Sequence, residues 1–240
     1  MHYLLRKQVV LFTVLVLLGF TSQAQFTQRY RPFHDDLPYY FGLTLGYNSS
    51  YLHTTKSSRF LQSDSVMSVE AGASGGIAMG LLATLKLNDR FELRANPQLI
   101  IGGSKYLSYR MNLTKPGEPS FQKQILPATL VSVPIQVKFN SDRIGNFRTY
   151  MLGGIKFDTD LSSNSSLRNV EDIIKLKPGD FGLEAGIGFN FYLPFVTVSP
   201  EIKISYGLSN IHQRDPNLKY SNVLEKIQSR MIVFSIHLED

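Results

Sequence analysis

Hydrophobic and polar residues alternate along most of this chain with a period of two. The hairpin of residues 181–208 shows this most clearly, because almost every second residue of its two limbs is apolar. The residues between them are mostly glycine, small polar or charged. This spacing predicts strands, and limbs of about ten residues match strands that cross a bilayer at a tilt. The apolar positions are Phe181, Leu183, Ala185, Ile187, Phe189 and Phe191 on the first limb and Val196, Val198, Ile202, Ile204, Tyr206 and Leu208 on the second.

The same alternation recurs along the chain and predicts an all-β fold of about eight antiparallel strands. The connections alternate in length, as in outer-membrane barrels with short periplasmic turns and longer external loops. An even strand number also places the first and last strands' free ends, and so both chain termini, on the periplasmic side of the membrane. We therefore expect an up-and-down transmembrane β-barrel of the outer-membrane type. Its expected strands are residues 39–47, 76–87, 91–112, 125–139 and 147–158, the two limbs of the hairpin 181–208, and residues 226–238.

The third expected strand is the least regular. Pro97 has no N–H for a paired strand, and the Gly102-Gly103 pair favours a bulge or bend. Dividing the strand at these glycines would raise the strand number from about eight to about nine. The long connections are polar and are expected to be loops, with a helical turn near residues 170–174. These loops are residues 48–74, 113–123, 161–177 and 209–224.

The N-terminal residues are typical of a secretory signal peptide. Arg6 and Lys7 form a basic start, an apolar run follows, and residues 22–24 fit a cleavage site. The apolar run is shorter than a transmembrane helix needs, which disfavours the alternative of an uncleaved anchor. We expect a signal peptide at residues 1–24, a periplasmic segment at residues 25–38 and an outer-membrane barrel domain at residues 39–240.

The composition limits the classes of function. The chain has no cysteine, which excludes disulfides, thiolate–metal sites and lipoprotein-type lipid attachment. Its formal net charge is +6, and removing Arg6 and Lys7 with the signal peptide leaves +6 − 2 = +4. These charges are scattered singly, so nucleic-acid binding is not expected. Mean hydropathy is near zero, as in barrels whose outward and inward residues cancel.

The face opposite the apolar stripe carries charges, and the turns predict how these charges pair. Across the tight turn at residues 88–90, Lys86 is expected to face Glu92. Across the turn at Pro194, Glu184 is expected to face Lys203. A barrel of about eight strands has room only for side chains, and an unpaired buried charge costs several kcal/mol. We therefore expect a structural ion-pair network in the lumen, formed by Lys86, Glu92, Arg94, Lys138, Arg148, Lys156, Glu184, Glu201 and Lys203.

Aromatic residues gather near the ends of the expected strands, as the interface girdles of membrane barrels do. The girdle expected at the short-turn end consists of Tyr39, Tyr40, Phe91, Phe139, Phe147, Phe191, Tyr192 and Phe195.

Candidate chemistry is sparse. Glu184 and Glu201 would suit a catalytic carboxylate pair, but that chemistry needs an open cleft. Ser235 and His237 lie two apart on one strand face, and some barrel enzymes that cleave lipid use a Ser–His pair. The histidines are dispersed, without metal-ligand spacing. We therefore expect no catalytic, cofactor-binding or metal-binding residues, no enzyme activity, and no nucleic-acid or small-molecule partner.

Four segments carry a more particular pattern: residues 40–46 (YFGLTLG), residues 146–154 (NFRTYMLGG), residues 174–210, where IKLKPGDFGLEAGIGFNFYLPF is followed by SPEIK and YGLSN, and residues 220–222 (YSN). These segments resemble the PorT/SprT proteins of Bacteroidetes, which are small outer-membrane β-barrels of the type IX secretion system and, in gliding species, of gliding motility. The resemblance spans nearly the whole chain after the signal peptide and is densest at residues 146–210. The family has no known catalytic motif.

The resemblance implies an accessory or assembly component of the type IX secretion system rather than an enzyme. The implied partners are outer-membrane lipid and other secretion components, contacted through residues 48–74, residues 161–177 or the periplasmic turns. One alternative is a generic small structural or adhesion barrel. Two others stay open from the sequence alone: a lipid-modifying enzyme using Ser235 and His237, and a soluble calycin-like barrel with its apolar residues inside.

Overall fold

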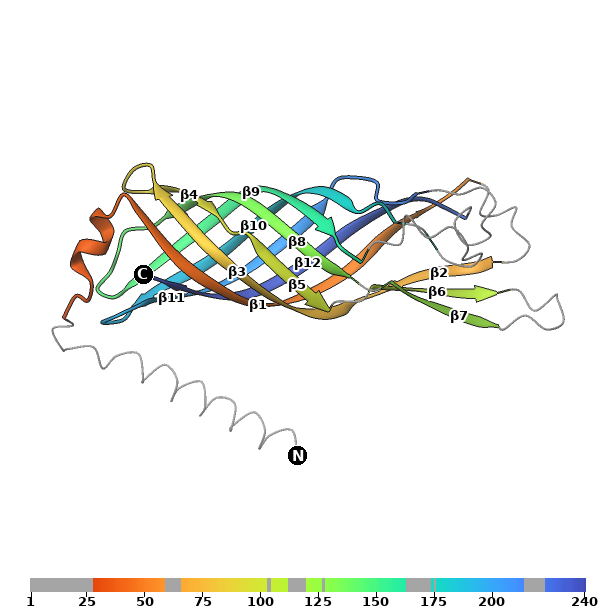
Figure 1. Ribbon diagram of the computed structural model, residues 1–240, viewed down its shortest axis with the longest axis horizontal. Helices are drawn as coiled ribbons and strands as arrows, with labels where there is room; N and C mark the ends of the chain where they lie inside the picture. The colour runs from red at the N-terminus through yellow and green to blue at the C-terminus, as the bar shows by residue number, and fades with distance from the viewer. Residues whose placement is uncertain are drawn as a thin grey trace, which may run out of the picture.

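A closed ring of eight antiparallel strands forms the body of the protein (Figure 1). The computed structural model describes residues 28–58, 66–102, 105–111, 120–126, 128–162, 174, 176–213 and 223–240. The ring consists of β1 (Tyr39–Lys56), β3 (Ser74–Lys86), β4 (Phe91–Ala95) together with β5 (Gln98–Gly102), β8 (Thr129–Asn140), β9 (Phe147–Asp160), β10 (Gly179–Tyr192), β11 (Thr197–Gly207) and β12 (Leu224–Glu239). It closes because β1 pairs with both β12 and β3. The predicted all-β antiparallel barrel is confirmed.

β4 and β5 share one place in the ring, since both pair with β3 on one side and with β8 on the other. The break between them falls at Asn96 and Pro97, as expected from the missing N–H of proline. The prediction of one strand over residues 91–112 is wrong. The chain leaves the ring after Gly102, whose φ of 82° is one that glycine adopts without steric cost.

A second, three-stranded sheet extends from the long-loop end of the ring (Figure 1). Its order is β2 (Val66–Gly72), β6 (Lys105–Met111) and β7 (Phe121–Leu126). Its buried face joins an apolar core that includes Leu52, Leu107 and Tyr109. This sheet corrects three expectations: residues 48–74 and 113–123 are not wholly loops, and the strand expected at residues 125–139 begins only at Thr129. These two stretches are mostly polar, but they also contain alternating apolar residues. Burial of these apolar residues in the shared core favours the extra strands.

Some expectations fall outside the described residues. These are the signal peptide at residues 1–24, the helical turn at residues 170–174 apart from Ile174, and most of the expected loops at residues 161–177 and 209–224.

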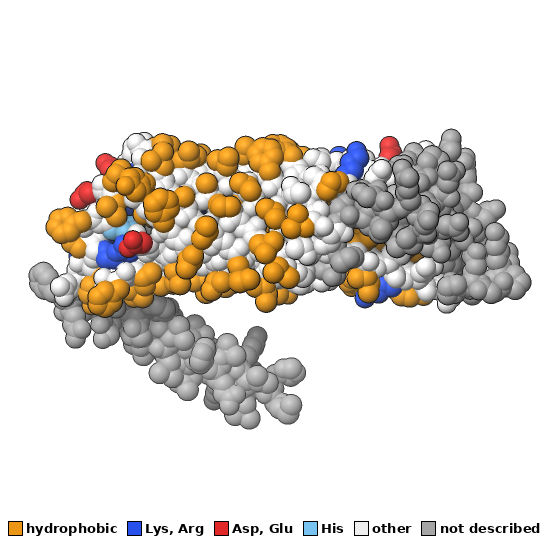
Figure 2. All heavy atoms as spheres, in the orientation of Figure 1, with side chains coloured by type: hydrophobic (Ala, Val, Ile, Leu, Met, Phe, Trp, Pro, Cys, Tyr) orange, Lys and Arg blue, Asp and Glu red, His pale blue; other side chains and the backbone are white. Residues whose placement is uncertain are grey.

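The ring reverses the usual arrangement of apolar and polar side chains. Figure 2 shows hydrophobic side chains spread over the outer wall. Leu81, Ile187 and Phe234 are typical, with 63%, 48% and 51% of their surface exposed, whereas Arg94, Gln136 and Lys138 point inward and are fully buried. This pattern contradicts the calycin-like alternative, which would place the apolar residues inside. Among the described residues, no helix is long and apolar enough to cross a membrane.

The register across the turn at Pro194 differs from the one expected. Tyr192 pairs with Thr197, so Glu184 lies opposite Ser205 and Lys203 lies opposite Gly186. The turn contains the four residues 193–196, closed by a hydrogen bond from Leu193 N–H to Val196 O at 3.0 Å. A two-residue hairpin turn needs positive φ angles that proline cannot adopt. At the turn of residues 88–90, in contrast, the expected Lys86–Glu92 pairing is confirmed.

Candidate functional site

A buried ionic cluster fills the middle of the ring. The guanidinium of Arg94 on β4 donates to Glu201 Oε2 on β11 at 2.8 Å and to Glu239 Oε1 on β12 at 3.0 Å. The Tyr150 hydroxyl on β9 donates to the same Glu201 oxygen at 2.8 Å. Lys203 Nζ lies 3.2 Å from Glu201 Oε1. The cluster therefore connects strands from different sides of the ring through the lumen.

A second buried pair lies beside this cluster. Lys138 Nζ on β8 is 3.2 Å from Glu92 Oε2 on β4, and the Tyr40 hydroxyl on β1 donates to the same oxygen at 2.9 Å. Lys138 Nζ also lies over the Tyr150 ring, 4.2 Å from its centroid. The Tyr150 ring thus packs between the two charge clusters.

The close pairing has a direct energetic cause. Each charge removed from water costs several kcal/mol, and only well-placed opposite charges and hydrogen bonds offset that cost. Arg94, Glu201 and Lys203 have side chains that are at most 1% exposed. The arrangement therefore fills the lumen with fixed, paired charges and does not present a free acid or base.

The residues of the expected network do not all meet in one cluster. Glu92, Arg94, Lys138, Glu201 and Lys203 meet in the middle of the lumen. Glu184 accepts a hydrogen bond from Gln136, and Lys156 pairs with Asp158. Lys86 and Arg148 lie at the short-turn end, where Lys86 Nζ is 3.1 Å from Asp89 and Arg148 Nη1 is 3.2 Å from Asp35. The expected Glu184–Lys203 pair is wrong, because the longer turn shifts the register by two residues.

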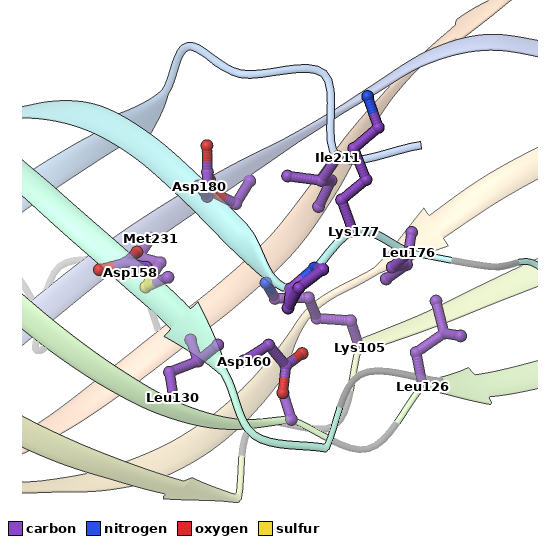
Figure 3. A pocket seen from close by; sticks show the side chains of 13 residues that line it. Lys105, Leu126, Leu130, Asp158, Asp160, Leu176, Lys177, Asp180, Ile211 and Met231 are labelled. Atoms are coloured by element: carbon purple, nitrogen blue, oxygen red, sulfur yellow. The ribbon is translucent and has the colours of Figure 1, made fainter. Parts of the chain in front are cut away.

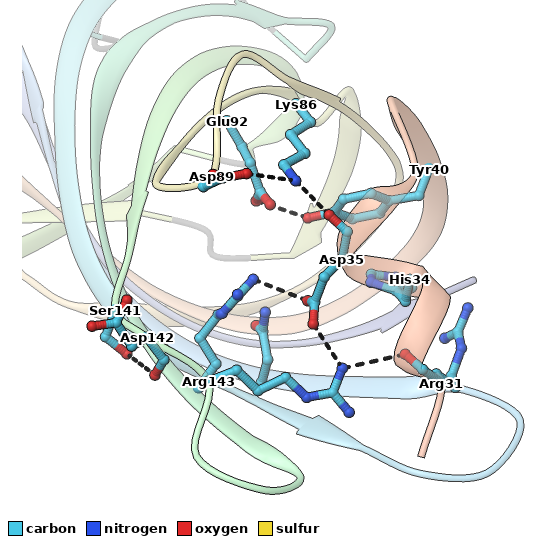
Figure 4. Close-up of polar contacts among 12 residues, drawn as sticks. Arg31, His34, Asp35, Tyr40, Lys86, Asp89, Glu92, Ser141, Asp142 and Arg143 are labelled. Atoms are coloured by element: carbon cyan, nitrogen blue, oxygen red, sulfur yellow. Dashed lines mark hydrogen bonds and ion pairs between the residues drawn. The ribbon is translucent and has the colours of Figure 1, made fainter. Parts of the chain in front are cut away.

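The short-turn end, called the mouth here, is covered by residues 28–37 (Figures 1 and 4). This segment contains a 3-10 helix, Pro32–Asp36. The Asp35 carboxylate is 3.1 Å from Arg143 Nη1 and 3.2 Å from Arg148 Nη1. Arg31 Nη1 donates to Glu239 O at 3.0 Å. The segment is thereby bound to both the β8–β9 turn and the end of β12.

His34 inserts from this segment into the mouth. Its ring packs against Tyr40 and Tyr192, with centroid distances of 4.9 and 5.7 Å. Its Nε2 is 3.0 Å from Asp240 O. Burial lowers the pKa of His34 below its usual value, and the positive charge of Arg31 lowers this pKa further.

These contacts correct part of the expected aromatic girdle. Tyr40 and Tyr192 are only 5% and 2% exposed and face His34 inside the mouth, whereas Tyr39 and Phe191 point outward. Neighbouring residues on a strand point to opposite faces, so the two residues of each pair cannot share the girdle.

A pocket lies at the opposite end, between the ring and the three-stranded sheet (Figure 3). Lys105, only 5% exposed, lines it together with Asp160 and Asp180. Burial lowers the pKa of Lys105, and nearby Lys156 lowers it further, while the surrounding aspartates oppose this shift. Among the described residues, no cluster of histidine and carboxylate side chains could hold a metal ion.

Ser235 and His237 do lie together, but without the geometry of a nucleophilic pair. His237 Nε2 is 3.3 Å from Ser235 Oγ and also 3.3 Å from Glu201 Oε1, while Nδ1 is 2.9 Å from Thr44 Oγ1. A Ser–His–acid relay requires the hydroxyl and the carboxylate on different ring nitrogens. Both residues are at most 1% exposed, so the structure offers no path for a lipid substrate to reach them.

The lumen network expected from the sequence omitted several residues of these sites. Tyr40, His237 and Glu239 occupy inward positions of strands whose outward residues were recognised. The period of two could have placed them in the lumen. Asp35 and Arg143 lie in irregular segments, and no periodic signal marks them.

A match to a protein-family model agrees with this architecture. The model of the outer membrane protein beta-barrel domain family matches residues 23–213. Among solved structures, OmpT, an outer membrane protease from Escherichia coli, is similar at 11% identity over 84% of this chain and 95% of its own, with a TM-score of 0.46. OprG from Pseudomonas aeruginosa has 14% identity over 82% of this chain and 94% of its own, with a TM-score of 0.41.

Neisserial surface protein A has 14% identity over 82% of this chain and 95% of its own, with a TM-score of 0.40. No curated protein sequence matches the chain. The family match covers most of the ring, so the exposed apolar wall is the surface that contacts membrane lipid. The chain belongs to the family of outer membrane protein beta-barrel domains.

Proposed function

We propose that this barrel is a non-enzymatic scaffold of the outer membrane and an accessory component of the type IX secretion system, and of gliding motility where that system supports it. The observation that carries the scaffold role is the lumen. Arg94, Glu201 and Lys138 fill it with paired, buried charges, which is the arrangement of a structural interior. The assignment to type IX secretion is supported by the resemblance of residues 146–210 to PorT/SprT proteins.

On this proposal, lipid contacts hold the ring in place and its ends contact other secretion components. The surfaces proposed for these contacts are residues 48–74, residues 161–177 and the short turns. Residues 1–24 are proposed to be removed on export. N-terminal sequencing of the protein purified from outer membranes tests that step, with Gln25 as the expected first residue.

A clean gene deletion tests the secretion role. Cargo proteins that carry the C-terminal type IX signal should accumulate in the periplasm and return to the medium when the wild-type gene is restored. Complementation with the Ser235→Ala, His237→Ala double variant should restore secretion equally well. Normal cargo secretion in the deletion strain, with the protein verified as absent, would leave only the alternative of a structural or adhesion barrel.

A further inference from the structure

Asn146, in the β8–β9 turn, holds the main chain of the N-terminal segment. Its Oδ1 accepts the Tyr30 N–H at 2.8 Å, and its Nδ2 donates to Gln28 O at 2.8 Å. These two main-chain groups are two residues apart on the segment. A side-chain amide that pairs in this way binds the backbone of an extended peptide without reading its side chains.

The same turn supplies a carboxylate site. Arg143 donates to the carbonyl oxygens of Tyr30 and Arg31 and, at 3.1 Å, to Asp35 Oδ2. Arg148 contributes from β9, with Nη1 3.2 Å from Asp35 Oδ1, and Arg29 of the segment itself lies 2.8 Å from Asp35 Oδ2. The two barrel arginines have side chains only 1% and 13% exposed. Converging guanidinium groups bind a carboxylate through short, charge-assisted hydrogen bonds.

Asn146, Arg143 and Arg148 belong to the ring and its turn, not to the segment they hold. The Arg143 guanidinium lies over the Tyr192 ring of β10 at 3.6 Å, which fixes its position independently of the segment. The segment itself buries little apolar surface, since Phe33 is 78% exposed and Leu37 is 40% exposed. Its attachment therefore depends mainly on polar contacts that another chain with the same groups could replace.

We propose that the mouth is a binding site for a carboxylate-bearing peptide segment of a partner protein, and that residues 28–35 occupy this site as an internal competitor. Asn146 binds the partner's backbone, and Arg143 with Arg148 binds its acidic side chain. This inference goes beyond the proposed scaffold role and applies whether or not the barrel serves type IX secretion.

The test uses spin labels on the full chain in detergent micelles. The chain has no cysteine, so Phe33→Cys and Phe195→Cys give one labelled pair between the segment and the β10–β11 turn. The probe is a synthetic peptide with the sequence of residues 28–38. The tethered segment competes with the added peptide at an effective concentration of order mM. The labelled chain therefore also carries Asp35→Asn, which removes the carboxylate of its own segment and weakens this competition. The matched control chain carries Asp36→Asn, which leaves the Asp35 ion pairs intact.

The peptide should displace the labelled segment of the Asp35→Asn chain and lengthen the label-to-label distance. Its midpoint concentration should be about tenfold lower than with the Asp36→Asn chain, because the internal carboxylate competes there. A peptide carrying Asp35→Asn should compete about tenfold less well. Equal competition by both peptides, or no displacement at mM peptide, would overturn the proposal. Exchange of segments between two copies, seen as dimers by light scattering, would also overturn it by identifying a second copy as the occupant.

Discussion

Arg94 and Glu201 form an ion pair of 2.8 Å across the lumen, from strands β4 and β11 that are not neighbours in the ring. Both side chains are fully buried, and Glu239 holds the other side of the guanidinium at 3.0 Å. The pair therefore fixes the distance between two parts of the wall that backbone hydrogen bonds do not join directly.

Replacing Arg94 by methionine should strongly destabilise the barrel. The substitution keeps a long apolar side chain but leaves Glu201 and Glu239 without their shared cation, and breaking a buried pair costs about 3–5 kcal/mol. Urea unfolding of the protein refolded in lipid vesicles measures this free energy. The control is Arg90→Met, since Arg90 lies on the rim with its side chain 59% exposed. That change should alter the free energy of unfolding by no more than about 0.5 kcal/mol. A similar, small loss in both variants would contradict a structural role for the lumen pair.

Glycine on the inner wall allows two strands to approach closely. A Cβ added at Gly154 would overlap the carbonyl oxygen of Ile135 on the neighbouring strand, whereas a Cβ at Gly179 would meet nothing within 4 Å. Gly154→Ala should therefore lower stability by about 1–3 kcal/mol, the usual cost of overpacking, and Gly179→Ala should be nearly neutral. The heat-induced shift in gel mobility of folded barrel gives the midpoint temperature of each variant. Equal midpoints would show that the wall relaxes around the added methyl group.

Acidification should loosen residues 28–37 from the mouth. Burial and Arg31 lower the pKa of His34 in the docked state below the ordinary histidine value of 6.5, while Glu239, Asp35 and the Asp240 carbonyl oppose this shift. Docking therefore favours neutral His34. The contribution of neutral His34 to docking is fully present above pH 6.5, and it is lost as the pH falls through the lower, docked-state pKa of His34.

Amide hydrogen exchange at Tyr30 and Leu37, corrected for the intrinsic effect of pH, measures this loosening. Protection should fall between pH 7.5 and about pH 5. His34→Gln should remove most of this pH dependence, whereas His53→Gln, on an exposed part of β1, should leave it unchanged. If His34→Gln kept the full pH response, another group at the mouth would control the segment.

Local alternation predicted the ring and its inward charges well, because the side-chain period of a strand depends only on neighbouring residues. It also placed Arg94, Lys138 and Glu201 on the inner face, but it did not identify Glu239 as a partner of Arg94 or Tyr150 as a partner of Glu201. Partners across the lumen depend on strand order, stagger and turn length. The turn at Pro194 illustrates this dependence: one turn of four residues moved Lys203 from Glu184 to a position opposite Gly186. The mouth was missed because Asp35, Arg143 and Asn146 come together only after the ring has closed.

The register of the β10–β11 hairpin determines which buried charges pair in the lumen, and this pairing can be measured. Lys203 Nζ is 3.2 Å from Glu201 Oε1, whereas Glu184 receives its hydrogen bond from Gln136. A double-mutant cycle between Lys203→Met and Glu201→Gln should therefore give a coupling free energy above about 1 kcal/mol. The cycle between Lys203→Met and Glu184→Gln should give less than about 0.5 kcal/mol. All variants are compared by urea unfolding in the same vesicles. Strong coupling of Lys203 to Glu184 and weak coupling to Glu201 would indicate that the hairpin adopts the two-residue turn, with every inward residue of β11 shifted against β10.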